Sequence, residues 1–447
     1  MEYIQHALEG ELKKRRAQKK DRRLEDGVPL YGEQTMLTVQ NMSFSGRKLG
    51  DYPEYISNAI KVKKACAIAN FTVGNLDFEH FMAINAACDE LMAREYPEQF
   101  PVDVYHGGGG IGINMNLNEV IAGLAGKGVN PIDHVNMSQS TSDVCHTAMR
   151  MTIDEMIKDL LEESERMKNV LKEKAEEFKD VDTIARTCLQ DGMRVSSGAL
   201  FSATASAVNR RLRSLAENSS EMRKINLGWT VIGSGIGASD AYREIIVEEL
   251  RNVTGKNFTW SQNMYDAAEY PDDLADISAE VRVIAEIMAK LARDLRLLSS
   301  GPEAGFKEII LPAVQKGSSF FPGKVNPVIP ETMIQCSMLI SGNDSVIQGC
   351  VGAGEIHLNL WEDMMGFLLM DNIRQLTKAL KLFREHCLKN ARLNEENCRK
   401  YANSSMAQVV DLKEDVSYTD LSDAISEQGT AEIIEQYKSS EETKGES

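Results

Sequence analysis

The stretch that decides the fold class is residues 151–179, MTIDEMIKDLLEESERMKNVLKEKAEEFK. It contains neither proline nor glycine, so no residue interrupts a helix along its length. Such a helix is far longer than the average of about 11–12 residues. Its apolar side chains recur every three or four positions, as on one face of an α-helix: Ile153, Met156, Ile157, Leu160, Leu161, Met167, Val170, Leu171, Ala175 and Phe178.

The same periodicity predicts further long helices in the later part of the chain, over residues 194–224, 272–300, 330–350 and 357–390. Two shorter helices are expected nearer the N-terminus, over 53–71 and 77–95, the first of them starting at Pro53. Long helices that follow one another in sequence predict a helical bundle. Strands do not alternate with these helices, which disfavours a doubly wound α/β fold. The predicted fold class is therefore mainly α.

Composition narrows the functional class. The 447 residues suggest two to four domains, and 50 Lys and Arg against 67 Asp and Glu give a net charge of −17. A hydrophobic content of 43% argues against a disordered chain, and the acidic balance argues against nucleic-acid binding as the main role. No apolar run is long enough to cross a membrane and no signal-peptide pattern is visible, so we expect a soluble, cytoplasmic protein. The eight cysteines show no zinc-type spacing and are expected to be reduced. The basic segment 11–23 is either a solvated helix face or a partner-binding arm.

Three glycine-containing segments are candidate ligand loops. The segment His106–Gly112 contains a formal G-x-G-x-x-G, with Asp133 about 20 residues further on, but no βαβ unit surrounds it, which disfavours dinucleotide binding. The other two segments are GWTVIGSGIG at 228–237 and GSSFFPGKVNPVIPE at 317–331. In an extended stretch Lys324 and Asn326 face the same way, and together they suit a carboxylate. Ser318 or Ser319 could serve as a base if backbone amides and Lys324 stabilise its charged form. A purely structural loop remains an alternative.

Residues 317–326, GSSFFPGKVN, resemble the signature G-S-S-x-x-P-x-K-x-N of the aspartase/fumarase superfamily, with Phe321 where methionine is usual. NMNLNEVIA (114–122) with DHVNMSQSTSD (133–143) is similar to the family's first conserved region, and RTCLQD (186–191) to the second. Residues 99–110, 295–312 and 325–331 resemble the aspartase branch. The resemblance covers roughly residues 28–390, and the chain after 391 is shorter than in typical aspartases.

This resemblance implies an architecture of three mostly helical domains. We expect an N-terminal domain at 1–140, a central long-helix domain at 141–390, and a small C-terminal helical domain at 391–447 that ends in a disordered tail. It also implies a homotetramer in which four subunits pair their central helices into a twenty-helix core. Each active site would then be built from three subunits.

The resemblance also implies a reaction and residue roles. A base removes a proton from the carbon next to an electron-withdrawing group, and an amine leaves from the adjacent carbon. Ser318 is implied as the base, and Lys324, Asn326 and Thr187 as the residues that hold the α-carboxylate. Glu331 would support the loop. Ser140, Thr141 and Ser319 would line the pocket for the group that stabilises the carbanion. The substrate is a small amino acid or betaine, and no metal or organic cofactor is implied.

The chain departs from the aspartase pattern at the positions that surround the substrate. Ile111, Ser142 and Cys188 stand where aspartases have Thr, Asn, and His or Gln, and His146 and Arg194 replace prolines. We expect all five to contact the substrate, although His146 could instead cap or pack and Arg194 could form a salt bridge.

The first three replacements reduce the polarity around the amino group. A primary ammonium needs acceptors for its three donors, whereas a quaternary ammonium has no donors. The sequence therefore favours a carbon–nitrogen lyase similar to ergothionase, which eliminates trimethylamine from ergothioneine to give thiourocanate. Aspartate ammonia-lyase is the alternative. A non-catalytic structural homologue is a third reading, which the retained polar loop disfavours.

Overall fold

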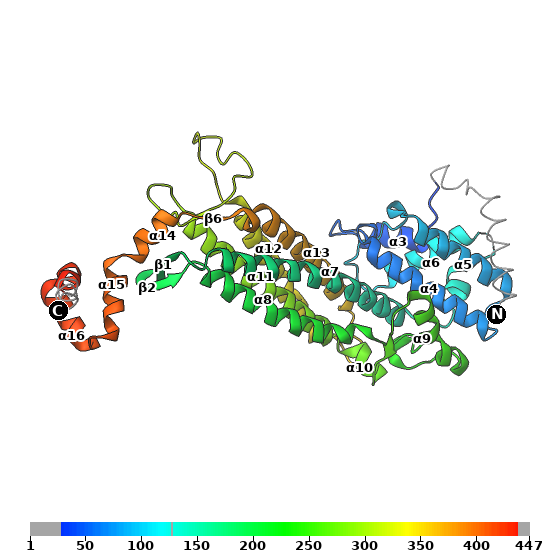
Figure 1. Ribbon diagram of the computed structural model, residues 1–447. Coiled ribbons are helices and arrows are strands. Elements are labelled where there is room, and N and C mark those ends of the chain that lie inside the picture. The colour runs from blue at the N-terminus through cyan, green and yellow to red at the C-terminus, as the bar shows by residue number, and fades with distance from the viewer. Residues whose placement is uncertain (1–27, 127, 437–447) are drawn as a thin grey trace. The chain divides into compact units, whose positions relative to one another are not determined.

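The computed structural model describes residues 28–126 and 128–436 (Figure 1). The basic segment 11–23 and the predicted disordered tail, SSEETKGES at 439–447, lie outside the described residues. The chain divides into two compact units. The first unit comprises Met1–Leu160, Ser214–Val281 and Ile340–Arg374, and the second comprises Leu161–Arg213, Arg282–Leu339 and Gln375–Ser447. The predicted division into three domains stays a prediction.

The long helices confirm the mainly α fold class. They are α7 (Thr141–Glu177), α8 (Ala199–Asn218), α11 (Asp272–Leu298), α12 (Val328–Val351) and α13 (Glu362–His386). Each contributes one segment to each unit. Eight of the ten apolar positions that predicted α7 are buried, while Leu161 and Ala175 are half-buried. The predicted helix at 194–224 was wrong at its start, because residues 190–196 form a strand.

The first unit is built on short and medium helices. These are α3 (Glu33–Met42), α4 (Pro53–Thr72), α5 (Phe78–Ala93), α6 (Ile111–Ala125), α9 (Asp240–Thr254) and α10 (Met264–Glu269), with the π-helix η3 (Pro131–Val135). The two-residue strands β3 (Lys224–Ile225) and β4 (Thr259–Trp260) pair in parallel. Short 3₁₀ turns are η1 (Leu49–Asp51), η2 (Pro97–Gln99), η4 (Ser219–Arg223) and η5 (Val231–Gly233). Figure 1 shows α3, α4, α5 and α6 gathered together, and α4 packs on α5 and α9.

Aromatic packing joins α4 to α13 inside the first unit. The rings of Tyr52 and Tyr55 lie 4.8 and 5.1 Å from the ring of Phe367, and all three residues are buried. Burial of aromatic rings contributes a large share of core stability. The helix α4 therefore packs on α13 as well as on α5 and α9, and it carries a buried lysine, Lys63.

The second unit adds an antiparallel hairpin of β1 (Asp182–Thr187) and β2 (Gln190–Ser196) to the long-helix segments. A smaller pair joins β5 (Ile309–Ile310) to β6 (Arg392–Leu393). The C-terminal helices predicted after residue 391 are present as α14 (Glu395–Ala402), α15 (Ser405–Asp411) and α16 (Tyr418–Gln428), with the 3₁₀ turns η6 (Leu388–Asn390) and η7 (Leu412–Glu414). Among the described residues, no helix is both long and apolar enough to span a membrane.

Candidate active site

The predicted site residues are divided between the two units, and each group is described by itself. The first unit holds Ile111, Ser140, Thr141, Ser142 and His146. The second unit holds Thr187, Cys188, Arg194, Ser318, Ser319, Lys324, Asn326 and Glu331. Assembly of the two groups into one site stays a prediction.

The segment Ser140–Ser142 in the first unit is fixed by the carboxylate of Asp143. Asp143 is fully buried and accepts three backbone N–H bonds, from Ser140 (2.8 Å), Gly228 (3.0 Å) and Thr230 (3.3 Å). Burial raises its pKa to about 6, against the effect of these donors. The carboxylate therefore ties the start of α7 to the glycine loop 228–237, which sequence analysis had singled out.

The hydroxyl of Ser142 makes a second tie to the same loop. Its Oγ donates to the Thr230 carbonyl at 3.0 Å. Thr230 and Ile232 have φ angles of 51° and 53°, a left-handed conformation that is costly for β-branched residues. The bonds from Asp143 and Ser142 help to hold this strained loop against the segment that starts α7.

The loop that precedes Ile111 is the glycine-rich segment 106–110. No strand precedes it in the described chain, so the dinucleotide-binding geometry is not formed. The buried His106 donates from Nδ1 to the Asp103 carbonyl (2.8 Å) and accepts the Gly112 N–H at Nε2 (2.8 Å). Burial lowers the pKa of His106, which favours the neutral ring that this bonding pattern requires. The side chain of Ile111, the first residue of α6, is left 51% exposed.

His146 lies in a buried ionic cluster. Its Nδ1 lies 3.0 Å from Glu362 and 2.9 Å from the guanidinium of Arg150. Arg150 also binds Glu362 and makes a two-pronged ion pair with Asp273 at 2.8 and 2.9 Å. Glu362 is half-buried, and although burial raises its pKa, its contacts with His146 and Arg150 outweigh that effect and lower the pKa to about 2. His146 thus has protein partners on one ring nitrogen, and its contact with substrate stays a prediction.

In the second unit, Thr187 and Cys188 lie at the tip of the β1–β2 hairpin. Thr187 pairs with Gln190 across a two-residue turn, in which Cys188 and Leu189 have φ angles of 52° and 63°. Two positive φ angles are typical of the primed turns that close hairpins. Cys188 is the one exposed cysteine among the eight.

The hairpin is anchored behind its tip. Arg186 forms a 2.7 Å ion pair with the buried Glu308, and its guanidinium lies over the ring of Phe306 at 4.2 Å. Arg194 bonds to the Ala402 carbonyl (2.8 Å) and pairs with Asp411 (2.7 Å). Arg194 therefore links the hairpin to the C-terminal helices, and its predicted role in substrate binding remains untested.

The loop 317–326 folds back on itself around Ser318. The Oγ of Ser318 accepts the backbone N–H groups of Phe320 (3.0 Å) and Phe321 (2.8 Å). Donors directed at an oxygen stabilise negative charge on it, which is the condition that a serine base needs. Sequence analysis had named backbone amides as one possible source of this stabilisation.

The two ends of this loop are joined by the side chain of Asn326, which donates to the Gly317 carbonyl at 2.7 Å. This bond uses one of the two amide hydrogens and leaves the other available. The ammonium of Lys324 is exposed and lies 5.4 Å from the centre of the Phe321 ring. Glu331, in the first turn of α12, pairs with Arg296 at 3.4 Å. Ser319 is exposed beside Ser318.

The groups behind these residues were not predicted from the sequence. Asp143 lies inside the block 133–143 that carried the resemblance, so its position was a usable signal. Lys63 and Glu362 lie outside the recognised blocks, and nothing in their local sequence marks Lys63 as buried or Glu362 as the partner of His146 and Arg150. Among the described residues, no group of three or more His, Cys, Asp or Glu side chains gathers as a metal site.

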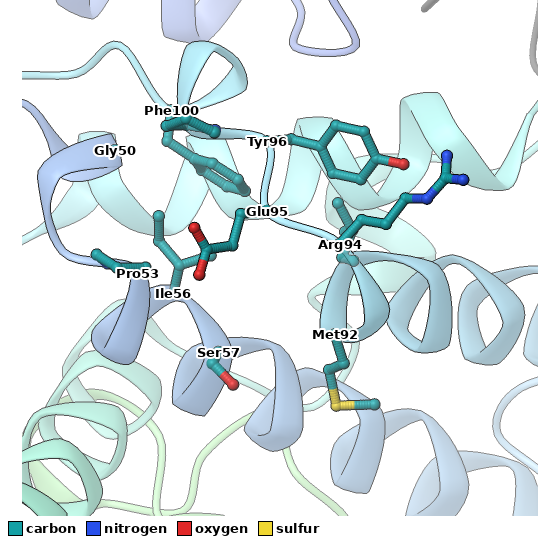
Figure 2. Close-up of a pocket in the computed structure, with 11 residues that line it drawn as sticks. Gly50, Pro53, Ile56, Ser57, Met92, Arg94, Glu95, Tyr96 and Phe100 are labelled. Carbon is teal, nitrogen blue, oxygen red and sulfur yellow. The ribbon is translucent and has the colours of Figure 1, made fainter.

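A small surface pocket in the first unit has a volume of about 130 Å³ (Figure 2). Ile56, Leu91 and Phe100 line it together with the polar side chains of Arg94 and Glu95. It is smaller than the roughly 300–1,000 Å³ of typical ligand pockets. None of the predicted site residues lines it, so it is separate from the candidate active site.

Comparison with known proteins identifies the family to which this chain belongs. A family model described as lyase matches residues 27–342. An aspartate ammonia-lyase from Bacillus sp is 38% identical over 87% of this chain and 85% of its own length, and one from Escherichia coli (strain K12) is 34% identical over 86% and 82%.

Solved structures agree. A fumarate lyase:delta crystallin from Brucella melitensis, bound to cobalt, matches with a TM-score of 0.85 and 36% identity over 92% of this chain and 90% of its own. A class II fumarase from Schistosoma mansoni matches with a TM-score of 0.85 and 27% identity over 89% and 88%. The chain belongs to the lyase family of the aspartase/fumarase superfamily and is a carbon–nitrogen lyase.

Proposed function

We propose that this enzyme catalyses the β-elimination of ammonia from an amino-acid carboxylate, with aspartate as the substrate that best fits its relatives. The observation that carries the proposal is the position of Ser318, whose Oγ accepts two backbone N–H bonds in a loop that also presents Lys324 and Asn326. The similarity to aspartate ammonia-lyases over most of the chain supports the choice of substrate.

In the proposed reaction Ser318, as the alkoxide, removes a proton from the carbon next to one carboxylate. The electron pair stays on that carbon and is delocalised into the carboxylate. The carbon–nitrogen bond then breaks, the nitrogen leaves with the bonding pair, and a double bond forms between the two carbons. Lys324, the free amide hydrogen of Asn326 and the Thr187 hydroxyl would hold the other carboxylate. Ser140, Thr141 and Ser319 would donate to the carboxylate that takes up the developing charge, and donors directed in this way typically contribute about 3–4 kcal/mol each.

A second candidate is elimination of a quaternary amine, as in the ergothionase reaction. The observation that favours it is the apolar side chain of Ile111 at a position where aspartases have Thr. Ile111 is half exposed at the start of α6 and offers no acceptor to an ammonium group. Each donor of a primary ammonium left unpaired costs about 1–3 kcal/mol. A trimethylammonium group has no donors to satisfy.

A two-substrate assay separates these candidates. The full chain is incubated with aspartate and, separately, with ergothioneine, and the ultraviolet absorbance of fumarate or of thiourocanate is followed. Fumarate from aspartate supports the first candidate. Thiourocanate without fumarate supports the second. Formation of neither product would exclude both.

The role of Ser318 is tested by Ser318→Ala. We expect the turnover to fall by at least about 100-fold, the usual contribution of a general base. The melting temperature should not change, since the side chain lies in an exposed loop. Ser220→Ala, at an exposed serine that bonds only to the Glu217 carbonyl among described residues, is the matched control. A Ser318→Ala enzyme with a third of normal activity would remove Ser318 from the mechanism.

We further propose that the active enzyme is a homotetramer. Apolar side chains on the outer faces of the second-unit helices support self-association, because exposed large apolar residues on helices are typical of interfaces. Leu297, Met338, Leu339 and Leu382 are 40–61% exposed. Light scattering at several concentrations measures the mass, and a stable monomer of 49.7 kDa with full activity would contradict this proposal.

A further inference from the structure

Lys63 on α4 is a buried cation that the proposed reaction does not use. Its side chain has no exposed surface, and no ion pair within the described residues includes it. Its ammonium donates to two neutral oxygens, Oδ1 of Asn136 and Oε1 of Gln139, each at 2.9 Å. Burying a charge that is hydrogen-bonded only to neutral groups is costly. A neutral residue would avoid that cost, so the charge calls for an explanation beyond packing.

Two contacts of Asn136 determine the polarity of a series of side-chain amides: its oxygen accepts from Lys63 at 2.9 Å, and its NH₂ group donates to the Gln139 carbonyl at 3.2 Å. An ammonium only donates, so the Asn136 atom that it contacts must be the oxygen. Asn114 approaches the same oxygen at 3.1 Å and must therefore present its NH₂ group there. The same NH₂ group lies 3.0 Å from Oγ1 of Thr141.

This series of hydrogen bonds ends at Thr141. Because Asn114 donates to its oxygen, the Thr141 hydroxyl must accept at that contact, and its own hydrogen has to point elsewhere. No acceptor for that hydrogen is found among the described residues. Thr141 is half-buried and is predicted to line the pocket for the group that stabilises the carbanion.

We propose that Lys63 is a positioning residue for the Thr141 hydroxyl. Acting through Asn136 and Asn114, it directs the hydroxyl hydrogen toward the substrate carboxylate that carries the developing charge. This inference rests on the proposed function for the identity of that carboxylate. Lys63 is not a catalytic residue, since it reaches the site only through the two amides.

The charged and titratable groups around Lys63 are compatible with this role. Cys66 on the same helix, Cys88 on α5, and Asp143 and Cys145 on α7 face the ammonium. Burial raises the pKa values of the Cys66 and Cys88 thiols to about 12 and that of the Cys145 thiol well above its usual range, so all three stay neutral. Burial lowers the pKa of Lys63 to about 8, which leaves the ammonium mainly protonated at neutral pH.

The test measures the binding of succinate, a saturated dicarboxylate, by calorimetry of the full chain. Lys63→Met and Asn114→Ala should each weaken binding by about 10-fold, as expected for one lost hydrogen bond to a charged group. Asn118→Ala is the matched control, because Asn118 donates to the same Asn136 oxygen at 3.2 Å but makes no bond to Thr141. It should change binding less than about two-fold.

Non-additivity shows whether the effect passes through Thr141. Asn114→Ala combined with Thr141→Val should bind no more weakly than Thr141→Val alone, because both changes remove the same interaction. Binding by the unmodified chain should also weaken as the pH rises through 8, and Lys63→Met should lack this step. Equal effects of Asn114→Ala and Asn118→Ala, or full additivity, would overturn the proposal.

A readout without substrate separates this inference from the proposed function. The melting-temperature changes of Lys63→Met and Asn114→Ala should fail to add, whereas those of Asn114→Ala and Lys174→Met should add. Lys174 is a buried lysine of the second unit that bonds to Glu177 and to the Ala391 carbonyl. If the melting-temperature changes of Lys63→Met and Asn114→Ala added, the proposed coupling of Lys63 to Asn114 would be refuted even in an active enzyme. A chain that neither binds succinate nor turns over aspartate would refute the proposed function. The melting-temperature changes of the single and double variants would still test the coupling of Lys63 to Asn114.

Discussion

Gly317 provides a sharp test of the closed loop around Ser318. An alanine Cβ at this position would lie 2.5 Å from the Val325 Cα and 2.7 Å from the Asn326 N, which are backbone atoms that cannot rotate away. Carbon atoms pack at about 3.5–4.0 Å, so the loop ends have to separate by about 1 Å. The φ angle of Gly317 lies outside the left-handed region, so space alone excludes the side chain.

Gly317→Ala should therefore displace Lys324 and Asn326 relative to Ser318. A displacement of about 1 Å at reacting groups costs about 100-fold in rate, or about 2.7 kcal/mol of barrier. The assay is kcat/KM for elimination, measured together with the melting temperature. We expect the melting temperature to stay within about 2 °C of the unmodified enzyme, because the loop is exposed and contributes little to stability.

Gly342→Ala on α12 is the matched control. Its Cβ would meet no atom within 4 Å, and alanine is favoured over glycine in a helix by up to about 1 kcal/mol. Activity should be unchanged and stability equal or higher. If Gly317→Ala kept kcat/KM within three-fold of normal, the closed loop would not be the reactive arrangement and the argument from its geometry would fail.

Three further predictions follow from other contacts. Arg186→Met should lower stability by about 3–5 kcal/mol, because it leaves the buried carboxylate of Glu308 unpaired; a melting temperature within 2 °C of normal would contradict this. Asp363→Asn should raise stability at pH 8, by at most about 4 kcal/mol, and have no such effect at pH 4. Burial and the charge of Glu362 raise the pKa of Asp363 to about 7, above its ordinary value of 3.8. Ionisation of Asp363 therefore lowers the stability of the folded protein as the pH rises from about 4 to 7. Equal effects of Asp363→Asn at pH 4 and pH 8 would disprove this prediction. Ile111→Thr combined with Ser142→Asn should increase fumarate formation from aspartate by about 10-fold or more, and an unchanged rate would show that these positions do not set specificity.

Most of the helical fold was predictable because its periodicity is strong and long. The predicted bounds 53–71, 77–95 and 272–300 lie within two residues of α4, α5 and α11 at each end. The β1–β2 hairpin was missed for a physical reason. Its strands, DTIART and QDGMRVS, are exposed or half-buried apart from Ile184, and they lack an apolar alternation. What holds the hairpin is the contact of Arg186 with Glu308, more than 100 residues away, and no local pattern reports such a contact.

The candidate site was predictable to the extent that it follows a motif. The loop 317–326 and the segment 140–142 were located by residue type and spacing. The groups that hold such segments in place were not predictable, because the roles of Lys63 and Asp143 depend on their burial, which the local sequence does not report. A lysine in an Ala-rich helix looks like any solvated lysine in the sequence. Only the packing of α4 against its neighbours shows that this ammonium is enclosed.

Two of the positions that depart from the aspartase pattern, Ile111 and Cys188, differ in kind from the groups that hold the site. Asp143 and Lys63 are fully buried and multiply bonded, so replacing them would disturb the fold as well as the site. Ile111 is half exposed and Cys188 is exposed at a hairpin tip. An isoleucine side chain left half exposed gains little from burial within the chain, so intrachain packing does not account for its presence. Contact with a bound molecule or a partner subunit would supply the missing burial. We therefore expect the buried framework to support the elimination and these exposed positions to set the choice of amine.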